Sequence, residues 1–165
     1  MRSSQEVIGL PVIHLQTGKR LGTVQDLLFD ADQQMIGVLL EHPGWIRRGR
    51  YIPFFKIRSL GADAVIVNSE ADIHSVKENQ DWHGLLTGQR KLKGRPVMLA
   101  NGQELGMVED VYILENRGIL LGYELSEGLI SDLTEGRKVF RPGSPLMWGE
   151  DVLIASMDGQ PTQDV

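Results

Sequence analysis

The chain has 165 residues and a net charge of −5, with 41% hydrophobic and 24% charged residues. This composition is typical of a globular protein that forms one domain or two small ones. The absence of cysteine excludes disulfide bonds, thiolate metal sites and cysteine nucleophiles, and no apolar run approaches the ~20 residues that would span a membrane.

The negative charge lies in the second half of the chain. Residues 1–80 carry nine basic and nine acidic residues, whereas residues 81–165 carry eight and thirteen. Because nucleic-acid binding depends on neutralising phosphates, an acidic half argues against a general nucleic-acid-binding protein. The N-terminus lacks a long apolar run and is interpreted as neither a signal peptide nor an anchor.

Short β-strands separated by turns are predicted from the start of the chain. An apolar run at residues 12–15 precedes a Thr17-Gly18 turn, and a second strand is predicted over residues 24–29. Residues 30–33 supply the next turn. Strands at this spacing predict a small barrel or sandwich.

The next strand carries a glycine in its interior. Residues 35–40 are apolar except for Gly37, which indicates a bulge or a tight bend. Long helical periodicity is absent; a turn or two of helix is predicted over residues 71–86, and another short helical turn over residues 126–136. The chain is therefore predicted to be all-β.

The second half of the sequence repeats the first. Residues 17–26 read TGKRLGTVQD and residues 101–110 read NGQELGMVED, and further matching blocks follow in the same order at an offset of 84 to 87 residues. Preserved order across several blocks indicates an internal duplication. Positions interpreted as structural parts of the repeated motif are Gly18, Gly22, Asp26, Gly37, Gly102, Gly106, Asp110 and Gly122.

The duplication divides the chain into predicted units. We expect one β unit over residues 4–70 and a second over residues 88–157. Residues 71–87 would form the linker, and residues 158–165 a loosely ordered tail. Each unit would be marginally stable alone, so the two are expected to pack against each other.

The first unit combines a Gly-x-Pro-Val strand, an x-Gly-x-x-Leu-Gly-x-Val-x-Asp hairpin, a glycine-bearing apolar strand, a Tyr-Ile-Pro step and a closing Ala-Val-Ile-Val strand. This series resembles the PRC-barrel domain, and the resemblance covers both halves of the chain. It implies an all-β fold of two tandem small PRC-type β-barrels joined by a short, partly helical linker. The second unit has Phe140-Arg141-Pro142 in place of Pro53-Phe54-Phe55, so the Ile-Pro step is altered there.

The PRC-barrel family is named for the cytoplasmic part of the photosynthetic reaction-centre H subunit. It also includes the C-terminal domain of the bacterial small-subunit ribosome maturation factor. The chain lacks a transmembrane helix like that of the H subunit, and it lacks the second, different N-terminal barrel of the ribosome maturation factor. The specific role of neither protein therefore transfers directly to this chain. Family members act mostly as docking and assembly modules, which implies a protein-binding role.

No catalytic or metal-binding set is predicted. Asp26 and Asp110 would suit paired acid–base chemistry, but with no neighbouring nucleophile or histidine they are interpreted as acceptors of backbone hydrogen bonds beside their hairpins. The phosphate-binding and hydrolase motifs that we sought are absent, so no enzyme and no cofactor are expected. The histidines also lack the spacing of metal ligands: His14, His42, His74 and His83.

One loop of the first unit is a candidate binding patch. It lies between predicted strands and combines a Trp and an Ile with several arginines on a Pro/Gly background, which suits contact with protein or RNA. The alternative is that Trp45 folds back to cap the barrel end. The candidate residues are Trp45, Ile46, Arg47, Arg48 and Arg50.

The leading functional hypothesis is a non-catalytic, cytoplasmic adaptor that binds another protein. One alternative is a ribosome or RNA-processing assembly factor that contacts ribosomal RNA or a ribosomal protein. A second alternative is a protein that binds a small ligand in a cleft between the barrels. Because an edge strand can pair two chains, a homodimer is expected about as often as a monomer.

Overall fold

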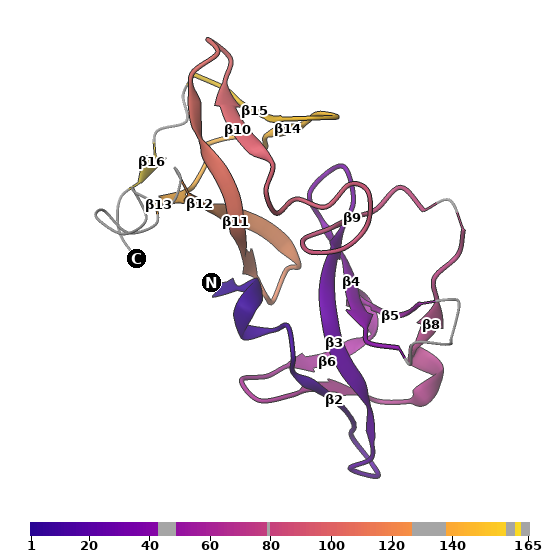
Figure 1. Ribbon diagram of the computed structural model, residues 1–165. Helices are drawn as coiled ribbons and strands as arrows, with labels where there is room; N and C mark the ends of the chain where they lie inside the picture. The colour runs from indigo at the N-terminus through magenta and orange to yellow at the C-terminus, as the bar shows by residue number, and fades with distance from the viewer. Residues whose placement is uncertain (43–48, 79, 127–137, 158–160, 163–165) are drawn as a thin grey trace.

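The computed structural model describes residues 1–42, 49–78, 80–126, 138–157 and 161–162, and these residues form strands and short 3-10 turns (Figure 1). No helix in this described part is long and apolar enough to cross a membrane. The elements are β1 (Arg2–Ser3), η1 (Ser4–Glu6), β2 (Pro11–His14), β3 (Arg20–Phe29), β4 (Met35–Leu40), β5 (Arg50–Pro53), η2 (Phe54–Lys56), β6 (Ile57–Leu60), β7 (Val65–Val67), η3 (Glu70–Asp72), β8 (His74–Ser75), β9 (His83–Gly84), β10 (Pro96–Leu99), β11 (Glu104–Leu114), β12 (Ile119–Ser126), β13 (Lys138–Phe140), β14 (Met147–Trp148), β15 (Leu153–Ala155) and β16 (Pro161–Thr162).

The strands form two sheets of the same design. The first has the order β6-β7-β2-β3-β4-β5-β8, and the second has the order β14-β15-β10-β11-β12-β13-β16. In each sheet one long central strand, β3 or β11, pairs antiparallel with both neighbours. Each also contains one parallel pair, β2 with β7 and β10 with β15. The prediction of an all-β fold built from two tandem units is confirmed.

Equivalent bulges interrupt the central strands. The pairing of β3 with β4 shifts register between Val24 and Asp26, and the pairing of β11 with β12 shifts between Val108 and Asp110. A second shift in each pair occurs next to the strand glycines Gly37 and Gly122, as the glycines predict.

Gly37 is required by close backbone contact. A Cβ atom at this position would lie 1.9 Å from the carbonyl oxygen of Ile52 on β5, which no side chain can tolerate. At the equivalent Gly122 the nearest atom, the carbonyl oxygen of Phe140, would be 3.0 Å away. The remaining motif glycines lie in the β2–β3 and β10–β11 hairpins. Gly18 and Gly102 lie in the turns, and Gly22 and Gly106 lie in the strands β3 and β11.

The segment that precedes each repeat adds a strand to the sheet of the other repeat. Strand β1 pairs with β11 of the second unit, and strand β9 pairs with β3 of the first unit. The registers are equivalent, since Arg2 lies opposite Ile113 and His83 lies opposite Phe29, which is the counterpart of Ile113 at an offset of 84. Figure 1 shows the N-terminal segment against β11 and the segment around β9 beside β3. We call these two segments the first leader (residues 1–8) and the second leader (residues 83–93).

The turns after β3 and β11 meet at the centre of the molecule. Gln34 and Ile119, which are equivalent positions at an offset of 85, form a bridge with each other. The flanking hydrogen bonds are also equivalent, because Met35 N donates to Gly118 O at 2.7 Å and Leu120 N donates to Gln33 O at 3.2 Å. The two repeats are therefore related by an approximate two-fold axis through this bridge.

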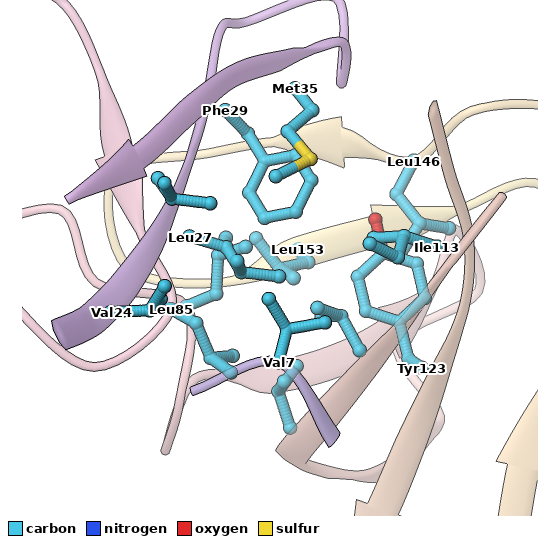
Figure 2. Close-up of a cluster of buried hydrophobic side chains, with 14 of the residues drawn as sticks. Val7, Val24, Leu27, Phe29, Met35, Leu85, Ile113, Tyr123, Leu146 and Leu153 are labelled. Carbon is cyan, nitrogen blue, oxygen red and sulfur yellow. The ribbon is translucent and has the colours of Figure 1, made fainter. Parts of the chain in front are cut away.

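One hydrophobic core extends across both repeats. The buried cluster includes Val24, Leu27 and Phe29 of the first unit together with Ile113 and Leu153 of the second. Val7 and Leu85, from the two leaders, lie within the same cluster (Figure 2). The repeats thus share a core instead of each burying its own.

The linker differs in detail from its prediction. Among its described residues, helical structure is confined to the 3-10 turn η3, where Ser69 Oγ accepts a hydrogen bond from Ala71 N at 3.1 Å. The chain then becomes extended, because His74 and Ser75 pair with Tyr51 and Arg50 as strand β8. Tertiary pairing overrides the weak local preference for helix here.

Candidate functional site

Asp26 is buried at the junction between the first unit and the second leader. Its carboxylate, 0% exposed, accepts hydrogen bonds from Thr87 Oγ1 at 2.6 Å, Thr87 N at 2.9 Å, and Leu85 N and Leu86 N at 3.1 Å. Leu27 N, from its own strand, donates at 2.8 Å. Burial raises the pKa of Asp26, whereas the Thr87, Leu86 and Leu27 donors lower it. Most of these donors are 59 to 61 residues away, whereas the sequence predicted partners beside the hairpin.

Asp110 occupies the equivalent junction between the second unit and the first leader. Its side chain is 1% exposed. Asp110 Oδ1 accepts a hydrogen bond from Val111 N at 2.7 Å and a short one from the hydroxyl of Ser4. Each central strand therefore holds the leader of the other repeat through the same aspartate.

The Asp26 carboxylate is surrounded by its structural donors. Within the described ranges, no three or more His, Asp and Glu side chains are grouped so that they could hold a metal ion. Asp26 and Asp110 therefore join the two repeats, because each accepts hydrogen bonds from the leader of the other repeat.

Most of the predicted Trp45 patch lies outside the described residues. This applies to Trp45, Ile46, Arg47 and Arg48. Arg50 is described and lies on β5, between Leu40 of β4 and Ser75 of β8.

Arg50 lines a surface groove of about 270 Å³ with Lys19 and Arg20, which we call the basic groove. The charge is partly balanced, because Lys19 Nζ lies 3.2 Å from Glu70 Oε1. Leu21 and Ile73 provide the apolar part of the lining. Arg50 is one of the predicted binding residues, whereas Lys19 and Arg20 were not predicted. They are about 30 residues away along the chain and reach the groove through the pairing of β3 with β4 and of β4 with β5.

A second groove, of about 500 Å³, lies beside the edge strand β6, and we call it the apolar groove. Phe55 on its rim is 78% exposed. The neighbouring Phe54 packs over the turn of the other repeat, since a Cβ atom at Gly118 would lie 2.7 Å from the Phe54 ring. Further lining comes from Ile57, Arg58, Ser59, Leu60, Glu115 and Asn116.

Phe55 was not among the binding residues predicted from the sequence. The sequence Pro53-Phe54-Phe55 does indicate an exposed aromatic residue, because two adjacent aromatic residues in a tight turn cannot both point into the core. Phe54 points toward the other repeat, which leaves Phe55 on the surface.

A third groove, of about 530 Å³, lies between the repeats, and we call it the inter-repeat groove. Its lining includes His83, Arg90 and Arg95 near the second leader and Trp148 of β14. The rings of His83 and Trp148 pack edge to face, with centroids 4.9 Å apart.

Most polar groups around Trp148 already bond to the protein. Trp148 Nε1 donates to Tyr123 Oη at 2.9 Å, and Tyr123 Oη donates to Gln33 Oε1 at 3.3 Å. Gln33 Nε2 donates to Leu146 O at 2.5 Å. Burial raises the pKa of Tyr123 far above its usual range, so its hydroxyl stays protonated and can donate. This chain of hydrogen bonds connects Gln33 of the first unit to the second unit.

We expect the buried His83 in the inter-repeat groove to make the stability of the fold depend on pH. Burial lowers the pKa of His83 below its ordinary value; the hydrogen bond with the Arg90 carbonyl opposes this effect, and the charges of Arg90 and Arg95 add to it. Because its folded pKa lies below its unfolded pKa of 6.5, its contribution to stability is fully present above about pH 6.5 and is lost as the pH falls through the folded pKa.

The measurement is urea denaturation at about pH 7.5 and about pH 5, for the natural chain and for His83→Gln. The natural chain should lose more stability on acidification than the variant. An equal loss in both proteins would show that His83 does not titrate against folding.

Comparison with known proteins gives a consistent result. A family model for the PRC-barrel domain matches residues 1–73 and 88–155. The chain is also 29% identical, over 150 residues, to the uncharacterized protein YrrD of Bacillus subtilis (strain 168), an alignment that covers 89% of this chain and 82% of that protein. The two matched segments correspond to the two repeats.

Proposed function

The chain belongs to the PRC-barrel family, and from that membership we propose that it is a non-catalytic adaptor that binds another protein in the cytoplasm. The sequence without cysteine suits a reducing compartment. The buried carboxylate of Asp26 serves as a structural acceptor, and the exposed grooves offer surfaces to a partner.

The observation that supports protein binding most strongly is the exposure of Phe55. An aromatic side chain that is 78% exposed gives a partner a large apolar area, and aromatic residues dominate the energetics of protein interfaces. It lies next to β6, which ends its sheet and can accept an additional strand from a partner. Phe55, Ile57 and Arg58 line the groove together, so the fitting partner is an extended segment with an apolar side chain and an acidic one.

The test compares Phe55→Ala with a matched control on the other sheet. Met147, on the edge strand β14, is 57% exposed and provides the control Met147→Ala. A partner captured from the native cell is purified, and its affinity for the three proteins is measured by calorimetry. Phe55→Ala should weaken binding at least about tenfold, while Met147→Ala should leave it unchanged.

Two other results are informative in this experiment. Self-association that Phe55→Ala abolishes would identify a second copy of the chain as the occupant. A partner that binds Phe55→Ala as tightly as it binds the natural chain would remove the apolar groove from the proposal. Because Phe55 is mostly exposed, circular dichroism should show the variant folded.

The basic groove supports a second candidate, an assembly factor that contacts RNA. Lys19, Arg20 and Arg50 converge on one surface of the first unit, where the charges of residues 1–80 balance. Replacing Arg20 and Arg50 with Gln should weaken RNA binding and reduce the slope of log affinity against log salt by about 1.5. The control is Arg117→Gln, an exposed position on the second unit. Absence of salt-dependent RNA binding would eliminate this candidate.

A further inference from the structure

The two equivalent aspartates differ at one oxygen. Asp26 Oδ2 accepts hydrogen bonds from Leu86 N, Thr87 N and Thr87 Oγ1. Asp110 Oδ2 is buried but has no hydrogen-bond partner among the described residues. A buried carboxylate oxygen without a donor is costly, so the exception needs a physical explanation.

The leaders explain the difference. Gly84 in β9 allows the second leader to come close to its aspartate, because a Cβ atom there would lie 2.5 Å from Asp26 Oδ2. Ser3 occupies the equivalent register position in β1 and carries a side chain. The first leader turns away as the 3-10 element η1, and only the hydroxyl of Ser4 is seen to reach the carboxylate, at Oδ1.

The first leader is also shorter. Five residues lie between Ser3 and Gly9, whereas nine lie between Gly84 and Gly94, the counterpart of Gly9. The additional residues in the second leader include Thr87, which donates to Asp26 through both its amide and its hydroxyl. The first leader has no such segment to cover Asp110.

A cavity of about 210 Å³ lies between residues of the two leaders, with Asp110 in its wall. Ile8, Leu85 and Leu86 form its apolar side. Glu109 adds a second carboxylate, and the polar lining also includes Ser4, Gln5 and the exposed Lys93. A volume of this size accommodates a small organic group, since one water molecule occupies about 30 Å³ of liquid.

The lining defines the chemistry of the ligand. Two carboxylates repel anions and favour a positively charged hydrogen-bond donor, and the apolar side favours an aliphatic stem. We propose that this cavity binds a primary ammonium group on a short aliphatic chain, which donates to Asp110 Oδ2. The group can come from a free amine or from a lysine side chain of a peptide. This site is independent of the apolar groove and of the proposed function.

The experiment titrates the full-length chain with butylammonium and, separately, with Nα-acetyl-lysine methylamide, and follows backbone amide chemical shifts by NMR. Saturable shifts are expected at residues that line the cavity, including Gln5, Leu86 and Glu109. The neutral isostere butanol should produce none. The probe that binds identifies the source of the ammonium group.

Asp110→Asn is the main variant, because its side-chain oxygen can still accept from Ser4 and Val111 while the amide nitrogen takes the place of Oδ2. It should weaken ammonium binding at least about tenfold. Asp151→Asn removes the same charge at an exposed position and should leave affinity unchanged. Equal binding by the natural chain and folded Asp110→Asn, or no saturable shift with either probe, would overturn the proposal.

Lys93→Met provides a second measurement that does not alter Asp110. Removing a like charge from the lining should tighten ammonium binding about threefold or more. Should Asp110→Asn fail to fold, unchanged or weaker binding by Lys93→Met would count against the site.

Discussion

Replacing Asp26 with alanine should lower the free energy of unfolding by about 3–5 kcal/mol. The substitution leaves Leu85 N, Leu86 N and the two Thr87 donors without their acceptor, in a region where Asp26 itself is fully buried. Each unsatisfied buried donor costs about 1–3 kcal/mol, with partial relief as the leader relaxes. A loss of this size is a large part of the total stability of an ordinary domain.

Urea denaturation of the natural chain, Asp26→Ala and Asp110→Ala measures this effect. Asp110 accepts hydrogen bonds from Ser4 and Val111, and only at Oδ1. Asp110→Ala should therefore lower the free energy of unfolding by less, about 1–3 kcal/mol. An equal or greater loss in Asp110→Ala would show that the hydrogen bonds of Asp26 do not hold the second leader.

The second large effect is expected at Gly37. Its added Cβ would lie 1.9 Å from a backbone carbonyl oxygen, that of Ile52, and the two paired strands would have to separate. Gly37→Ala should therefore destabilise the protein by about 3 kcal/mol or more, which is roughly a 6–12 °C lower Tm for a chain of this size.

Gly122→Ala is the matched control in the other repeat. Its added Cβ would lie 3.0 Å from Phe140 O, a contact that a small shift of a few tenths of an ångström relieves. Its Tm should fall by no more than about half as much as that of Gly37→Ala. Similar losses in the two variants would contradict the assignment of close strand contact to Gly37.

The sequence was sufficient to predict the duplicated β units, because their signals are local. Alternating apolar runs and the turns at Gly18 and Gly102 define the strands, and Gly37 and Gly122 mark the bulges. These features depend on residues close together in the chain, where periodicity and turn chemistry are informative.

The exchange of leaders could not be predicted in this way. Strand β1 contains two residues, and its partner in β11 lies more than 100 residues away. The donors to Asp26 are mostly backbone N–H groups, which every residue except proline possesses, so the identities of Leu85 and Leu86 gave no signal. The cavity at Asp110 depends on the shorter first leader, whose effect is visible only in three dimensions.

The grooves themselves could not be predicted from the sequence, and the binding patch around Trp45 stays a prediction. Arg50 lies in the basic groove, and its neighbours Trp45 to Arg48 lie outside the described residues. Lys19 and Arg20 join Arg50 through strand pairing, and Phe55 is exposed because Phe54 takes the contact with the other repeat. Convergence on a surface is a tertiary property, so single-sequence patterns identify it only when the residues are adjacent in the chain.

A shared core and reciprocal leaders predict that the two repeats unfold as one unit. Residue-resolved hydrogen exchange of the full-length chain at increasing urea concentrations tests this directly. The slowest amides of β3 in the first unit and of β11 in the second should converge on the same free energy of opening, and Asp26→Ala should lower both together. Separate free energies for the two strands, with only β3 responding to Asp26→Ala, would show instead that the repeats are independent domains.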